Sequence, residues 1–204
     1  MKTYFSIIKY LQETLLVISI IVLMVLPLVI VFNKEVISGE VTLKLYFIAE
    51  IFVFFVMIIR PLADIFTKVK WLRPLVILRK GTGVFSASII ISFILAKLII
   101  DPAGYLVSIL TLKYWSMVNY AILAHMADLS AIILIITSNN LSKKLLGERW
   151  KKIQKLAYVY FYGGALYVYL SFGGGYLLIM MIIVMTLTLI AFLVNKERLT
   201  KTTI

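Results

Sequence analysis

Six long runs of apolar residues divide the sequence and constrain its fold more than any other feature. They cover roughly residues 14–32, 42–59, 82–100, 115–137, 156–172 and 175–194. A helix needs about 20 apolar residues to cross the hydrocarbon core, and in lipid a helix satisfies its own backbone polar groups. The charged share is only 15%, against about a quarter in soluble domains. We therefore predict an all-α polytopic membrane protein, a six-helix transmembrane bundle that forms one domain over residues 1–204.

Lysine and arginine gather on one side of this predicted layout. The stretches 60–80 and 143–155, together with the two ends of the chain, hold seventeen of the 21 basic residues. Short, positively charged loops stay in the cytoplasm, so we expect both termini to be cytoplasmic and the membrane to be a bacterial-type cytoplasmic (inner) membrane. The net charge of +12 does not call for a nucleic-acid partner, because anionic lipid head groups attract basic loops. The expected partners are the lipid bilayer and a soluble or membrane protein.

The segment LSKKLLGERWKKIQKLAY, residues 141–158, has a repeating apolar pattern beside dense positive charge. Leu146, Trp150, Ile153 and Ala157 recur at helical spacing, which predicts an interfacial basic helix running into the fifth apolar run. The segment suits either a cytoplasmic anchor or a docking surface for a soluble partner. Its predicted cytoplasmic basic surface consists of Lys143, Lys144, Arg149, Lys151 and Lys152.

Three ionisable residues lie inside the apolar runs and predict an intramembrane polar cluster. Glu50 lies in the second run, and His125 and Asp128 lie one helical turn apart in the fourth. An ionisable group at the bilayer centre is costly, so each needs a partner or a function. The cluster can bridge helices structurally, or it can handle protons or a cation, as in a proton-coupled carrier. With one histidine and no cysteine in the chain, we expect no metal site and no self-contained catalytic site.

Three segments of the sequence resemble the ferric reductase-like transmembrane domain family. They are IIRPLADIF at 58–66, LRKGTGVFSAS at 78–88 and IITSNNLSKKLLGERWKKIQKLAYV at 135–159. Within that family the chain is most similar to the haem-binding membrane subunits of periplasmic methionine sulfoxide reductase systems. The resemblance covers roughly residues 42–172 and implies a six-helix membrane bundle.

The resemblance also implies where haem ligands would lie. In the family, histidines on the third and fifth helices hold b-type haem, and the matching positions here are Phe93, Gln154 and Tyr167. None can replace a bis-histidine pair. Phe93 and Tyr167 would lie at similar depth and are candidates to face each other. We expect no cofactor and a haem-free scaffold or partner subunit. The alternative is a haem b or quinone-linked electron-transfer subunit of a reductase system, for example one using His125.

Overall fold

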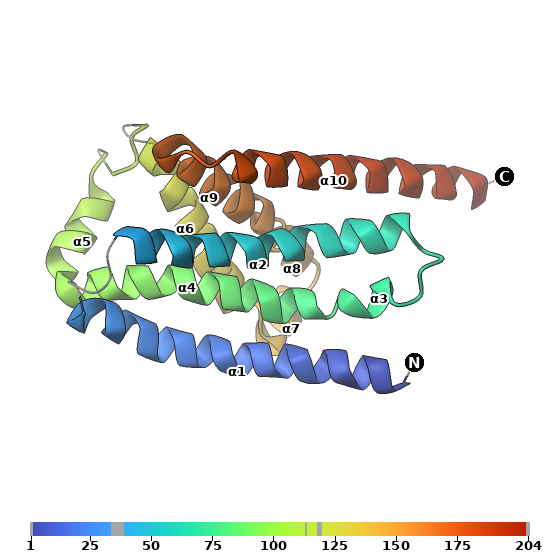
Figure 1. The fold of residues 1–204 in the computed structure, drawn as a ribbon, viewed down its shortest axis with the longest axis horizontal. Helices are drawn as coiled ribbons and strands as arrows, with labels where there is room; N and C mark the ends of the chain where they lie inside the picture. Colours follow the sequence, from blue (N-terminus) through green and yellow to red (C-terminus); the bar gives the residue numbers. More distant parts are fainter. Residues whose placement is uncertain (1, 34–38, 113, 118–119, 203–204) are drawn as a thin grey trace.

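The computed structural model describes residues 2–33, 39–112, 114–117 and 120–202, and within these ranges it contains helices and no strand (Figure 1). The helices are α1 (Lys2–Phe32), α2 (Gly39–Ile65), α3 (Leu72–Leu75), α4 (Leu78–Ile100), α5 (Pro102–Leu110), α6 (Ala121–Thr137), α7 (Asn140–Leu146), α8 (Glu148–Ile153), α9 (Leu156–Phe172) and α10 (Gly175–Thr202). The predicted all-α class is therefore confirmed for this part of the chain.

Four helical segments of the described chain are long and apolar enough to cross a membrane. They are Thr3–Phe32, Gly39–Ile65, Leu72–Ile100 and Gly175–Arg198. The pair α6 and α7 passes the same test jointly but bends by 96° between its two helices. These long apolar helices are compatible with an integral membrane protein. The full six-span layout stays a prediction, because α6 and α9 have 17 residues each and extend only about 26 Å.

Helix α4 is the centre of the bundle and packs against α1, α2 and α6. Gly81 lets α1 approach closely, since a Cβ there would lie 3.1 Å from both the Gln12 carbonyl oxygen and the Leu15 Cβ. Further along, Ser86 and Ser92 are fully buried on α4, and Ser92 Oγ, which donates to the Ser88 carbonyl at 2.7 Å, lies 3.3 Å from the Val22 carbonyl of α1. Small residues at such contacts are how membrane helices bring their backbones together.

Both termini lie at the same end of the bundle, together with α3 and the turn that precedes it (Figure 1). Two long-range contacts connect the terminal helices to that turn. The Tyr4 hydroxyl of α1 donates to the Trp71 carbonyl at 3.2 Å. Arg198 of α10 donates from Nη1 to the Asp64 carbonyl at 2.9 Å. Termini at the same end of the bundle agree with an even number of helices crossing the membrane. The side of the membrane on which this end lies remains a prediction.

Two predicted helices have different bounds in the structure. Of the run expected over 115–137, the α-helix α6 covers Ala121–Thr137, and Tyr120 before it adopts a left-handed backbone with φ of 58°. The basic segment is two short helices, α7 and α8, instead of one. Gly147 separates them at φ of 50° and ψ of −124°, a conformation that glycine adopts without a Cβ penalty. Helix α9, in contrast, coincides with the fifth predicted apolar run.

Candidate functional site

Glu50 lies deep in the bundle, where its carboxylate meets α9. The residue is only 5% exposed, and its carboxylate Oε1 lies where a Cβ on Gly164 of α9 would be. Glycine at 164 is therefore what leaves room for this carboxylate. The second oxygen, Oε2, has no hydrogen-bond partner among the described residues. A buried polar group without a hydrogen bond is costly, so this carboxyl group calls for a further partner.

His125 belongs to an aromatic group at the opposite end of the bundle from the termini. Its ring stacks on Tyr114 with centroids 3.5 Å apart, and it meets the Trp115 ring edge-on with centroids 5.9 Å apart. Tyr114 also lies within 3.4 Å of the Tyr105 hydroxyl. Burial and this hydrogen bond raise the pKa of Tyr114 above its usual value. The hydroxyl therefore stays protonated at physiological pH.

The three predicted cluster residues do not assemble into a metal-type site. Asp128 follows His125 by one turn on α6, while Glu50 contacts α9 through Gly164. No group of three His, Cys, Asp or Glu side chains with metal-binding geometry occurs in the part of the chain that the structure describes. The Nδ1 atom of His125 also lacks a hydrogen-bond partner there. All three residues lie inside helices, as the sequence predicts.

The three positions matched to haem ligands lie in three different settings. Phe93 is 9% exposed and stacks on Tyr46 of α2 with ring centroids 4.9 Å apart. Gln154 lies at the junction of α8 and α9, where Nε2 donates to Thr137 Oγ1 at 3.3 Å. Tyr167 meets Phe172 edge-on at 6.3 Å. No ring contact joins Phe93 to Tyr167 among the described residues, so each packs against a different aromatic partner.

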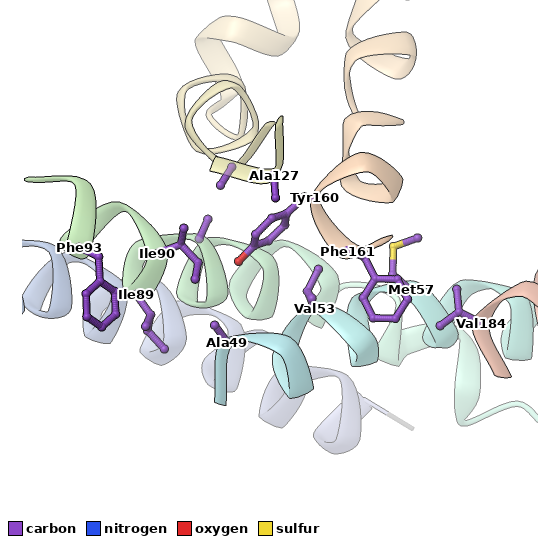
Figure 2. Close-up of a cluster of buried hydrophobic side chains, with 12 residues drawn as sticks. Ala49, Val53, Met57, Ile89, Ile90, Phe93, Ala127, Tyr160, Phe161 and Val184 are labelled. Carbon is purple, nitrogen blue, oxygen red and sulfur yellow. The ribbon is translucent and has the colours of Figure 1, made fainter. Parts of the chain in front are cut away.

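A hydrogen-bonded chain that the sequence did not predict joins α9, α4 and α2. Ser86 Oγ lies 2.7 Å from the Ala49 carbonyl and 2.7 Å from the Tyr160 hydroxyl. A carbonyl only accepts and serine has one hydroxyl proton, so Ser86 donates to Ala49 and Tyr160 donates to Ser86. Figure 2 shows Tyr160 reaching from α9 into the buried cluster, with fully buried Phe161 beside it. The sequence feature that could have indicated this chain of hydrogen bonds is the presence of serines inside an otherwise apolar run.

A cavity of about 790 Å³ opens at the end of the bundle that carries both termini. We call it the basic cavity because six cationic side chains line it: Arg60, Arg79, Lys80, Lys143, Lys151 and Lys155. Asp64 is the one carboxylate among its described lining residues. Its inner wall is apolar and includes the buried side chains of Val53, Met57 and Ala87. The sequence indicated basic loops here but not that they enclose a cavity.

Trp150 and Arg79 hold the walls of the basic cavity in place. Trp150 Nε1 donates to the Thr137 carbonyl at 2.9 Å, which fixes α8 against the end of α6. Lys143 lies over the Trp150 ring, 5.4 Å from its centroid. Half-buried Arg79 donates from Nε to the Val56 carbonyl at 2.9 Å. The guanidinium is therefore anchored to α2 at one nitrogen.

No known protein family, curated protein or solved structure matches this chain. The resemblance to the ferric reductase-like transmembrane domain family therefore stays a prediction from the quoted motifs.

Proposed function

We propose that the chain is a haem-free integral protein of a bacterial-type cytoplasmic membrane, related to the ferric reductase-like transmembrane domain family, and that it acts as a scaffold or partner subunit. The observation that carries this proposal is the setting of Phe93. A third-helix haem ligand is expected at this position, and here an apolar ring is buried and stacked on Tyr46. Phenylalanine cannot ligate iron. The Phe93 ring itself fills the space at this position.

The residues that the sequence offers as haem ligands support the same proposal. A bis-histidine haem needs two imidazoles, and the chain has one histidine. That residue, His125, lies in α6 and stacks on Tyr114, which precedes the helix. The exposed residues of the predicted basic surface, such as Lys144 and Arg149, leave α7 and α8 open to a cytoplasmic partner.

Visible absorption of the detergent-purified protein, expressed with added haem precursor, tests the proposal. We expect no Soret band and no sharp α and β bands after dithionite reduction. A near-stoichiometric b-type spectrum would refute the haem-free function and favour the electron-transfer alternative. The matched variant is His125→Ala, which would abolish that spectrum if the lone histidine were the ligand.

Labelling of single cysteines tests the proposed topology, because the natural chain has none to interfere. Leu145 in α7 is 77% exposed and Leu112 beyond α5 is 91% exposed. A membrane-impermeant thiol reagent applied to intact spheroplasts should label Leu112→Cys and should label Leu145→Cys only after lysis. The reverse pattern would overturn the cytoplasmic placement of the basic segment.

A further inference from the structure

We infer that the basic cavity is a binding site for an anionic phospholipid, with the lipid phosphate held by the cationic side chains and an acyl chain lying along the apolar wall. This site goes beyond the scaffold function, because a structural subunit needs no internal ligand. The cavity volume of about 790 Å³ is within the range of small-molecule sites, about 300–1,000 Å³.

The charge of the cavity calls for an anion. Of its six cationic residues, Arg60 has a carboxylate within 4.0 Å among the described residues, since its Nε lies 3.8 Å from Asp64 Oδ2. The other five have no such ion pair in that part of the chain. Like charges around one cavity repel each other unless a counter-charge is bound. A phosphate group would supply that counter-charge and the acceptor oxygens that arginine and lysine bind.

Arg79 is placed to serve as the inner phosphate contact. Its Nε donates to the Val56 carbonyl, which orients the guanidinium, and no hydrogen bond to its Nη atoms occurs within the described chain. Arginine presents its remaining donors as a rigid fork suited to phosphate. On the α10 side, Thr188 lines the cavity with a buried Oγ1 that has no hydrogen-bond partner among the described residues, so a polar head group can satisfy it.

The apolar wall favours a lipid over a free phosphate or a neutral quinone. Apolar side chains of Ile77, Leu134 and Phe192 line the cavity, and Phe192 is 64% exposed. A small inorganic anion would leave this accessible apolar surface without a partner, and a quinone would leave the cations without a counter-charge. An anionic phospholipid meets both requirements, and the cytoplasmic leaflet supplies it.

Native mass spectrometry of the purified protein, titrated with lipid in nonionic detergent, tests this site. We expect one molecule of phosphatidylglycerol to bind in preference to phosphatidylcholine. The double variant Lys80→Gln/Lys155→Gln should weaken that binding by about 30-fold, because each basic side chain near an anionic lipid contributes about fivefold. Both lysines are exposed, so the substitutions spare the core.

The control is Lys68→Gln/Lys70→Gln, which removes the same charge from exposed lysines at the same end that do not line the cavity. We expect a change of less than about threefold. Equal losses in the two double variants would mean general attraction to a basic surface and would overturn the site. Equal binding of the two lipids would also overturn it. Displacement of phosphatidylglycerol by inorganic phosphate at the lipid's own concentration would reassign the cavity to a soluble anion.

Discussion

The hydrogen-bonded chain from Tyr160 through Ser86 to Ala49 makes two substitutions interdependent. Ser86→Ala removes the acceptor of the buried Tyr160 hydroxyl and the donor to the Ala49 carbonyl. Tyr160→Phe removes only the first donor, and Ser86 keeps its bond to Ala49. We therefore expect the serine substitution to be the more destabilising of the two, although each removes a single hydroxyl group.

The magnitudes follow from what each variant leaves behind. An unsatisfied buried hydroxyl costs about 1–3 kcal/mol, whereas losing a satisfied pair costs about 0.5–1.5 kcal/mol. We expect the free energy of unfolding to fall by about 2 kcal/mol for Ser86→Ala and about 1 kcal/mol for Tyr160→Phe. The double variant no longer holds an orphaned hydroxyl, so it should cost about 2 kcal/mol, which is less than the sum. The resulting coupling of about 1 kcal/mol is within the range measured for hydrogen bonds between membrane helices.

Reversible unfolding with sodium dodecyl sulfate in mixed micelles, followed by circular dichroism, measures these free energies. The control cycle pairs Tyr160→Phe with Ser88→Ala, because the Ser88 hydroxyl donates within α4 to the Phe85 carbonyl at 2.7 Å. That cycle should be additive within about 0.5 kcal/mol. If the Ser86 cycle is equally additive, the hydrogen-bonded chain between α9, α4 and α2 does not exist.

Three further substitutions test contacts elsewhere in the bundle. Gly81→Val should push α1 off α4 and lower the unfolding free energy by more than about 2 kcal/mol, whereas Gly39→Val, with open space around it, should change stability little in the same titration. Asn139→Ala removes the side-chain N-cap of α7 and should cost about 1 kcal/mol; unchanged protease resistance of the basic segment would contradict this. Trp150→Phe loses the bond to the Thr137 carbonyl and should detach α8, seen as faster amide hydrogen exchange over residues 148–153.

The helices themselves were predictable because their signal is local. A run of apolar residues in lipid must satisfy its backbone internally, so the predicted run 42–59 lies within α2 and the run 156–172 coincides with α9. The break at Gly147 also had a visible cause, since glycine interrupts a basic segment that otherwise has helical periodicity. The start of α6 at Ala121 had no visible cause in the sequence, because Tyr120 is not a residue type that favours φ of 58°.

The contacts between helices were not predictable from one sequence. A membrane helix is apolar on all sides, so its pattern does not show which face meets a neighbour. For that reason the contacts of Glu50 with Gly164 and of His125 with Tyr114 were not predicted. The basic cavity could not be predicted for a related reason. Its cationic side chains, such as those of Arg79 and Lys155, come from segments far apart in the chain.

Unequal helix lengths give the bundle two different hydrophobic thicknesses. Helices α1 and α10 have 31 and 28 residues, whereas α6 and α9 have 17 each. The shorter pair spans about 26 Å, less than the roughly 30 Å of an average hydrocarbon core. On the predicted six-span layout, lipids beside α6 and α9 would have to compress, a mismatch that costs fractions of a kcal/mol per Å. On that layout the protein should prefer thin membranes.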